Sequence, residues 1–361
     1  MAEPAPPQSL PHRPVAHRSV RAAFAALDLG TNNCRLLVGA PEGEGFRVLD
    51  SFSRIVRLGE GLHETGRLSA SAMERAMAAL HACAARLGRR PLRGLRAIAT
   101  EACRRASNGR DFLARVHEQT GIAIDVISSR EEAELALESC APLLHANVAG
   151  ARRALLFDIG GGSTELAWVR LGEARPALIG PALIGYASLP VGVVTLAERF
   201  GPAGTTPEGF AAMVADVLAR LSDFERVHCI IKEIQHGGVQ LLGTSGTVTT
   251  LAGVALGLPR YRRPLVDGTV LTAAASEQAL ATLLALGRQG LSLHPCVGPE
   301  RAEFVLPGCA IFAAIRAMWP AGQVVVADRG LREGMLLRLM RAAAARRAGL
   351  ARRFAGRSRY A

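Results

Sequence analysis

The stretch "LLFDIGGGSTEL" at residues 155–166 runs from apolar residues into Asp158, three consecutive glycines, two hydroxyl residues and Glu165. A related stretch, "ALDLGTNNCRLL" at 26–37, leads an apolar run into Asp28, followed by a glycine, a hydroxyl residue and two amides. Each pattern predicts a strand, a tight turn and a second strand, which together form a hairpin. Two such hairpins, a domain's length apart in the chain, indicate a duplicated architecture.

Glycine-rich turns of this kind are suited to binding phosphate. A backbone without side chains lets several N–H groups approach one phosphate, and Gly160, Gly161 and Gly162 offer three of them beside the hydroxyl of Ser163. Mg²⁺ prefers carboxylates together with phosphate oxygens and water, so the two aspartates at the strand ends are candidate ligands. With a third turn, "GTSGT" at 243–247, the pattern favours a phosphate site. The alternative is ordinary hairpins, in which glycine adopts positive φ and aspartate makes an Asx turn.

The composition limits the classes of partner. The chain has 361 residues, enough for two domains, and hydrophobic residues make up 49% of it, enough for a sizeable core. Lys and Arg number 43 against 31 Asp and Glu, so the net charge of +12 favours an anionic partner such as nucleic acid, a nucleotide, polyphosphate or an acidic membrane surface. Aromatic residues are only 4%, which disfavours the stacking surfaces of single-stranded nucleic-acid binders. No specific nucleic-acid partner is expected.

Cysteine usage and the N-terminal sequence indicate a cytoplasmic protein. The seven cysteines form no C-x-x-C pair, so neither a disulfide framework nor a zinc site is expected. Residues 1–21 lack the apolar segment of a secretory signal. No apolar run approaches the ~20 residues that span a membrane, so no membrane association is expected.

Strands alternate with helices along the chain, which predicts an α/β fold. We expect one unit over residues 23–147 and a second over 148–330, with a hinge at 146–153. Residues 1–22 are expected to be a disordered basic tail, and 348–361 a second basic tail. No G-x-G-x-x-G leads from a strand into a helix and no G-x-x-x-x-G-K-[ST] occurs, so neither a Rossmann nor a Walker-type site is expected.

Seven segments in order make the chain resemble one known family. They are "DLGTNNCRLL", "ATEACRRASNG", "ISSREEAELA", "FDIGGGSTEL", "LPVGVVTLAERF", "GTSGTVTTLAG" and "DRGLREGML", and together they cover roughly residues 24–340. The chain is similar to the exopolyphosphatase and guanosine pentaphosphate phosphohydrolase (Ppx/GppA) family of the actin/hexokinase/Hsp70 superfamily, in its short two-domain form. The resemblance implies two actin-like (ribonuclease H-like) domains flanking an interdomain cleft, with the last helix, 331–347, returning to the first domain.

The resemblance also implies roles for individual residues. Glu132 matches the glutamate proposed in the family as the general base that activates water, and Glu131 is the alternative. From the residues alone, two carboxylates opening a helix are also what the helix dipole favours. The phosphate-binding residues implied are Thr31, Asn32, Arg104, Gly160, Gly161, Gly162, Ser163, Gly246 and Thr247. The implied ligands of a Mg²⁺ cofactor are Asp28, Asp158 and Glu165.

The expected reaction is Mg²⁺-dependent removal of the terminal phosphate from inorganic polyphosphate. The alternative substrate is guanosine pentaphosphate (pppGpp), which also ends in a phosphoanhydride. Thr195 stands near a position where the family often has arginine, and Asn33 and Cys34 depart from the usual first turn, so substrate preference stays open. Other classes to be considered are a sugar kinase or actin-like ATPase, and a non-catalytic polyphosphate sensor. A homodimer is one expectation for the oligomeric state, which the sequence leaves open.

Overall fold

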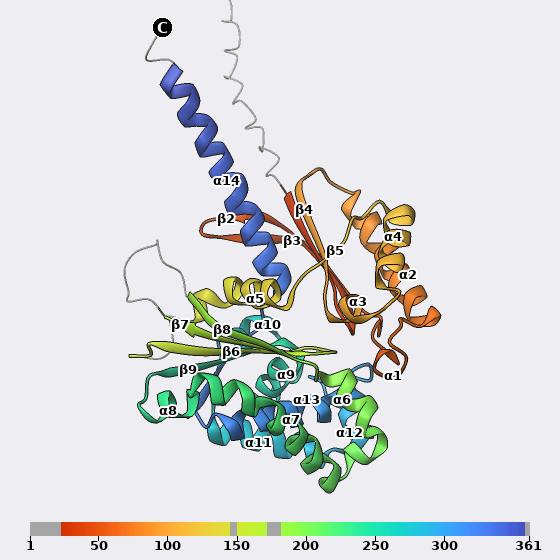
Figure 1. The fold of residues 1–361 in the computed structure, drawn as a ribbon, viewed down its shortest axis with the longest axis vertical. Coiled ribbons are helices and arrows are strands. Elements are labelled where there is room, and N and C mark those ends of the chain that lie inside the picture. The colour runs from red at the N-terminus through yellow and green to blue at the C-terminus, as the bar shows by residue number, and fades with distance from the viewer. Residues whose placement is uncertain (1–22, 145–149, 172–181, 358–361) are drawn as a thin grey trace, which may run out of the picture.

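The computed structural model describes residues 23–144, 150–171 and 182–357. The predicted tail at 1–22 lies outside these residues, as does part of the predicted hinge. Two β-sheets, each with helices on its faces, are joined through a middle layer that contains two helices (Figure 1). The α/β class predicted from the sequence is therefore confirmed.

The first sheet has five strands, built around a central strand that is buried along its length. Strand β1 pairs antiparallel with β2 and parallel with β4, so the predicted hairpin forms at the centre of the sheet. The buried residues of β1 form a nearly continuous apolar run, as expected for a strand covered on both faces. In spatial order the strands are β3 (Gly45–Ile55), β2 (Asn33–Glu42), β1 (Ala23–Leu29), β4 (Leu92–Ala99) and β5 (Asp125–Val126). The helices on its outer side are α1 (Leu62–Thr65), α2 (Ala70–Leu87), α3 (Glu101–Arg105) and α4 (Gly109–Thr120).

The second sheet has six strands and repeats the arrangement of the first. Its central hairpin, β6 and β7, is antiparallel, and β6 lies parallel to β9 on the other side. The order is β10 (Val270–Thr272), β11 (Gln323–Ala327), β9 (Val239–Thr244), β6 (Arg153–Ile159), β7 (Thr164–Arg170) and β8 (Ala182–Leu189). This part of the chain also contains a 3₁₀ turn at Gly201–Thr205 and eight helices among the described residues. The helices are α6 (Val193–Phe200), α7 (Pro207–His228), α8 (Ile230–Gln235), α9 (Ser245–Ala255), α10 (Arg263–Val266), α11 (Ala273–Ala285), α12 (Gly287–Leu293) and α13 (Ala302–Met318).

Helices α5 (Ser129–Leu144) and α14 (Leu331–Arg357) lie between the two sheets (Figure 1). One apolar cluster includes side chains from β1, α5, β6 and α14, so both sheets share part of their core. Helix α14 packs against α5 and against β1, β2 and β4 of the first sheet. The domain boundaries expected from the sequence stay a proposal.

Helix α14 is longer than expected. It continues to Arg357, whereas the sequence predicted a helix ending at 347 and a tail from 348 onward. The added segment, residues 348–357, contains three alanines and three arginines, which favour helix, and no proline. The helix therefore runs past its expected end, and the basic tail at 348–361 stays a prediction.

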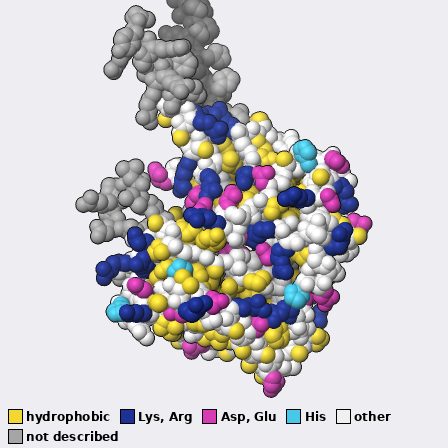
Figure 2. Space-filling model, in the orientation of Figure 1, with side chains coloured by type: hydrophobic (Ala, Val, Ile, Leu, Met, Phe, Trp, Pro, Cys, Tyr) yellow, Lys and Arg dark blue, Asp and Glu magenta, His cyan; other side chains and the backbone are white. Residues whose placement is uncertain are grey.

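The face of the molecule seen in Figure 2 carries charges of both signs side by side. Figure 2 shows Lys and Arg side chains interspersed with acidic and hydrophobic ones over the visible face. Within the part of the chain that the structure describes, no helix is long and apolar enough to cross a bilayer.

Candidate active site

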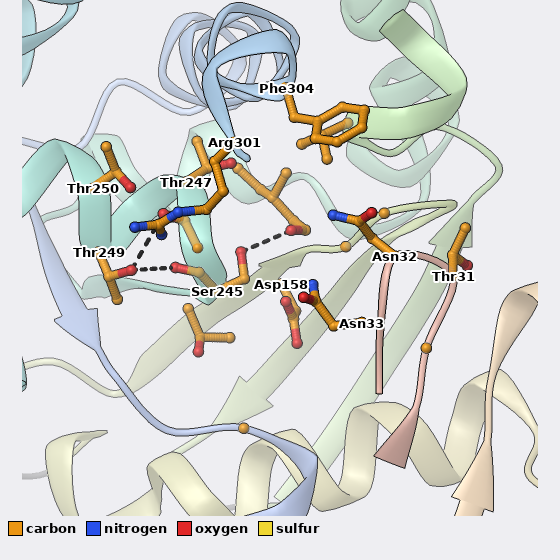
Figure 3. A pocket seen from close by; sticks show the side chains of 18 of the residues that line it. Thr31, Asn32, Asn33, Asp158, Ser245, Thr247, Thr249, Thr250, Arg301 and Phe304 are labelled. Carbon is orange, nitrogen blue, oxygen red and sulfur yellow. Dashed lines mark hydrogen bonds between the residues drawn. The ribbon is translucent and has the colours of Figure 1, made fainter. Parts of the chain in front are cut away.

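A cavity of about 870 Å³ lies where the two sheets face each other. The turns of both hairpins line it, as do the start of α9, the loop between β11 and α14, and the residues that lead into α13. Figure 3 shows Thr31, Asn32 and Asn33 from the first hairpin on one side, with Ser245, Thr247 and Arg301 on the other. The chain segments singled out from the sequence therefore meet around one space.

The two glycine-rich turns are packed directly against each other. A Cβ atom on Gly161 would lie 3.0 Å from Cβ of Asn32, and one on Gly162 would lie 2.7 Å from Oγ1 of Thr31. None of Gly160, Gly161 and Gly162 has a left-handed φ. These glycines are therefore required for close approach, and the alternative of glycines serving positive φ does not apply to them.

Cross-strand register makes the two hairpins equivalent at the site. In the first hairpin Asp28 pairs directly with Arg35, and in the second Asp158 pairs directly with Glu165. All four residues line the cavity. The duplication therefore places a carboxylate at the same point of each hairpin, but opposite a cation in one and a second carboxylate in the other.

Burial perturbs the three carboxylates that were expected to bind metal. Desolvation raises the pKa of Asp28, and its Oδ1 atom has no hydrogen-bond partner among the residues that the structure describes. Desolvation, with Asp28 nearby, raises the pKa of Asp158 to about 6. The pKa of Glu165 rises to about 7 through burial and the charge of Asp158, although Ser163 and Ser188 donate hydrogen bonds to its Oε1 at 2.5 and 3.0 Å.

These carboxylates fit a metal ion only as partial ligands. Among the described residues, no three His, Cys, Asp or Glu side chains converge closely enough to hold an ion by themselves. Mg²⁺ commonly uses one or two carboxylates and takes its other ligands from water and substrate phosphates. The unpartnered Oδ1 of Asp28, with Asp158 in the same cavity, fits that kind of site. The full predicted set that includes Glu165 stays a prediction.

Helix rotation separates the two adjacent glutamates at the start of α5. Glu132 is buried and lines the cavity, and burial together with the charge of Glu165 raises its pKa well above the ordinary value. Glu131 does not line the cavity. Its Oε1 accepts a hydrogen bond from Arg96 at 3.2 Å and lies 3.8 Å from Nη1 of Arg338.

Arg104 lies behind Glu132 rather than on the cavity wall. Its Nη1 donates to the Ile127 carbonyl at 2.8 Å and to Oε2 of Glu132 at 3.2 Å, and its Nη2 donates to Glu101 at 2.6 Å. The sequence predicted that Arg104 binds phosphate directly. In the structure its guanidinium is held by carboxylates because α3 and α5 bring them within reach, so the direct contact stays a prediction.

The third predicted turn forms the first turn of α9. Ser245 has a left-handed φ of 86° and donates through Oγ to the Ile159 carbonyl at 2.7 Å, which ties this turn to the end of β6. Thr249 donates in turn to the Ser245 carbonyl at 2.9 Å (Figure 3). Gly246 and Thr247 line the cavity, as expected for phosphate-binding candidates.

Four arginines to which the sequence gave no role line the cavity: Arg35, Arg301, Arg329 and Arg332. Arg301 is fixed from behind, donating to the Val297 and Cys296 carbonyls at 3.1 and 3.2 Å. Arg35 could have been found from the sequence, because it stands opposite Asp28 in the predicted hairpin. Arg329 and Arg332 lie in the segment "DRGLREGML" without having been assigned a role, and no local pattern marks Arg301.

The chain is similar to known proteins over most of its length. A family model described as the Ppx/GppA phosphatase family matches residues 38–343. The crystal structure of an exopolyphosphatase-like protein is 27% identical with a TM-score of 0.77, covering 88% of this chain and 97% of that one. A PPX-GPPA enzyme of Aquifex aeolicus is 27% identical with a TM-score of 0.69, covering 88% and 99%. An exopolyphosphatase from Cytophaga hutchinsonii is 22% identical with a TM-score of 0.76, covering 89% and 98%, and shows the shared fold alone.

Proposed function

This chain belongs to the Ppx/GppA phosphatase family of phosphoanhydride hydrolases, and we propose that it is a Mg²⁺-dependent exopolyphosphatase that removes the terminal phosphate from inorganic polyphosphate. Its two sheets form two actin-like domains. The observation that carries the proposal is the buried carboxylate of Glu132, which faces the same cavity as both glycine-rich turns.

The turns bind and orient the phosphate chain. The N–H of Gly160 is taken by the Ser163 carbonyl at 2.9 Å, so the donors left for phosphate are those of Gly161 and Gly162. Among the described residues, no backbone carbonyl accepts from either of these two groups. Backbone donors held in this way stabilise charge on a transferring phosphoryl group without reorganising during the reaction.

Glu132 takes the proton of the attacking water. Arg104 occupies Oε2, which leaves Oε1 as the acceptor. A raised pKa brings the carboxylate closer to the operating pH, where a general base is most effective. Phosphoryl transfer depends chiefly on positioning and charge neutralisation, so a carboxylate of this strength is sufficient.

Both a metal ion and arginine side chains would neutralise the negative charge of the substrate phosphates. Mg²⁺ held by Asp28 and Asp158 would neutralise negative charge that develops on the phosphate oxygens. Arg35, Arg301 and Arg332 add cationic side chains to the cavity wall, and guanidinium groups suit phosphate oxygens. The fit is to a substrate with several phosphates rather than to a single phosphate ester.

Hydrolysis of pppGpp is the second candidate because the cavity continues past the third turn to Tyr261. The Tyr261 hydroxyl donates to Oδ2 of Asp328 at 2.6 Å, so the ring is fixed on the cavity wall. The nearby Arg263 donates a hydrogen bond to Oε1 of Glu333 at 3.0 Å and does not line the cavity. A nucleoside could occupy the space beside Tyr261.

The deciding experiment measures phosphate release from long-chain polyphosphate and from pppGpp side by side at matched salt. The proposal expects a higher kcat/KM for polyphosphate. A higher kcat/KM for pppGpp would favour the second candidate function. Failure to release phosphate from either substrate would favour a non-catalytic sensor. We also propose a cytoplasmic location, because all seven cysteines are free thiols and free thiols are typical of a reducing compartment.

A further inference from the structure

The loop of residues 56–61, here called the clasp loop, is bonded to the first phosphate turn. Two of its N–H groups donate to the Asn32 carbonyl at 2.8 and 3.1 Å, and the N–H of Gly59 donates to the Thr31 carbonyl at 2.9 Å. A Cβ on Gly59 would lie only 2.3 Å from Cγ2 of Thr31. The loop and the turn are therefore close-packed and share three hydrogen bonds, so a displacement of one moves the other.

The same loop reaches across to helices that pack on the second sheet. The N–H of Gly61 donates to Oε1 of Glu198 on α6 at 3.0 Å. Nη2 of Arg57 lies 2.6 Å from Oε1 of Glu303 on α13, a charge contact in which no N–H is aligned well enough to make a hydrogen bond. The Arg57 guanidinium also lies 5.4 Å from the ring centre of Phe304.

Helix α6 is in turn bonded to the second phosphate turn. The N–H groups of Val193 and Val194 donate to the carbonyls of Gly160 and Gly161 at 3.0 and 2.8 Å. A Cβ on Gly192 would lie 2.5 Å from the carbonyl carbon of Gly161. The contacts thus run from the first turn through the clasp loop and α6 to the second turn, in addition to the direct packing of the two turns.

Backbone strain marks the residue at the centre of this connection. Arg57 has a left-handed φ of 48°, a conformation that residues other than glycine rarely adopt. Strained residues persist where the surrounding contacts hold them, and they gather at clamps and functional sites. Here the Asn32 carbonyl holds the backbone of Arg57, and Glu303 and Phe304 hold its side chain.

We propose that Arg57 and Glu198 are positioning residues whose contacts across the cleft, added to the direct packing of the two phosphate turns, fix the separation of these turns. Neither residue lines the cavity, so neither is expected to touch substrate. A polyphosphate chain that contacts both turns requires them at one spacing, because phosphoryl transfer needs the water, the base and the phosphorus in line. The catalytic part of this inference rests on the proposed function.

The competing explanation is a surface ion pair without consequence. Exposed pairs commonly contribute little, and Arg57 and Glu303 are each about one-third exposed, with side-chain exposures of 37% and 32%. Charge reversal separates the two explanations. Arg57→Glu alone places like charges together across the cleft, and the combined Arg57→Glu/Glu303→Arg variant restores attraction with the charges exchanged.

The expected result is a fall in kcat for Arg57→Glu of roughly ten- to a hundredfold, with a smaller change in KM, and recovery of most of the loss in the exchanged pair. Glu198→Ala should lower kcat likewise, whereas Glu198→Gln, which keeps an acceptor for Gly61, should retain it. The matched control is Arg67→Glu, which makes the same charge reversal at an exposed arginine that forms no ion pair among the described residues. A kcat for Arg57→Glu equal to that of wild type, or no recovery in the exchanged pair, would overturn the proposal.

A second measurement keeps this inference separate from the proposed function. Small-angle scattering without substrate should give a larger radius of gyration for Arg57→Glu than for wild type, and a return to the wild-type value in the exchanged pair. If wild type releases no phosphate, the proposed function fails, and the scattering measurement alone tests the positioning role of Arg57. An unchanged radius of gyration in Arg57→Glu would overturn the proposed positioning role even if the enzyme is active. Should Arg57→Glu fail to fold, Glu198→Ala against Glu198→Gln gives the same comparison.

Discussion

Glu132 carries the buried carboxylate that the proposed hydrolysis needs, and Glu131 beside it is a matched control. Glu132→Gln keeps the shape of the side chain but removes the base, so we expect phosphate release to fall by roughly 10²- to 10⁴-fold. Glu131→Gln should stay close to wild type, because Glu131 is paired with Arg96 outside the cavity. Steady-state kinetics on polyphosphate test both variants. A large loss in Glu131→Gln with little loss in Glu132→Gln would reverse the assignment.

At the same scale, the buried carboxylates predict a pH dependence of stability in metal-free buffer. Folding raises the pKa of Asp158 from 3.8 to about 6 and that of Glu165 from 4.5 to about 7. The folded state therefore binds these protons more tightly than the unfolded chain. Their contribution to stability is complete below pH 4 and is lost as the pH rises through 6 and 7.

Urea unfolding between pH 5 and pH 8 in the presence of a chelator measures this effect. The free energy of unfolding should decline more steeply with pH in wild type than in an Asp158→Asn/Glu165→Gln variant, because the variant lacks both titrating carboxyl groups. Identical slopes for the two proteins would show that the carboxylates do not bind protons in this range.

Helix α6 matters at the scale of elements because its N-terminus abuts the second phosphate turn. Gly192→Ala would place a Cβ 2.5 Å from the Gly161 carbonyl carbon, so the turn or the helix must shift. We expect a loss of about 1–3 kcal/mol in the free energy of unfolding, as for other overpacked sites, together with reduced phosphate release. Gly238→Ala is the control, because a Cβ there meets nothing within 4 Å. Equal stability and activity in the two variants would contradict the tight contact.

The same helix explains one departure of the sequence from its family. Thr195, which stands near a position that is often arginine, is buried and accepts a hydrogen bond from the N–H of Gly192 at 2.8 Å. It also donates to the Gly192 carbonyl at 3.1 Å, so it closes the first turn of α6. Thr195 therefore supports the second phosphate turn and does not itself line the cavity.

At the scale of the whole molecule, the site draws its carboxylates from both halves. Asp28 is the penultimate residue of a strand of the first sheet, and Asp158 is the penultimate residue of a strand of the second. Chelation with EDTA should abolish phosphate release, and added Mg²⁺ should restore it. Mg²⁺ with phosphate should also raise the thermal unfolding midpoint, because a ligand that binds only the folded state stabilises it. Full turnover in excess EDTA would exclude a required metal.

The sequence by itself determined the local units of this protein. Alternation of strands and helices, and the two aspartate–glycine hairpins, follow from short-range periodicity and turn chemistry, and both hairpins form where they were predicted. Residues within a hairpin are paired by register, so Asp28 and Arg35 could be placed opposite each other before any fold was known. Order along the chain was also enough to indicate the family, because its motifs are contiguous segments.

Only the tertiary structure decided which of these residues share the cavity and which do not. Glu131 and Glu132 are both acidic residues in the first turn of one helix, and the packing of α5 between the sheets alone buries one and leaves the other with Arg96. The place of Arg301 on the cavity wall and the contact of Arg57 with Glu303 depend on the packing of segments far apart in the chain. Such contacts are set by how apolar faces pack together, and local periodicity carries no information about which distant surfaces will meet.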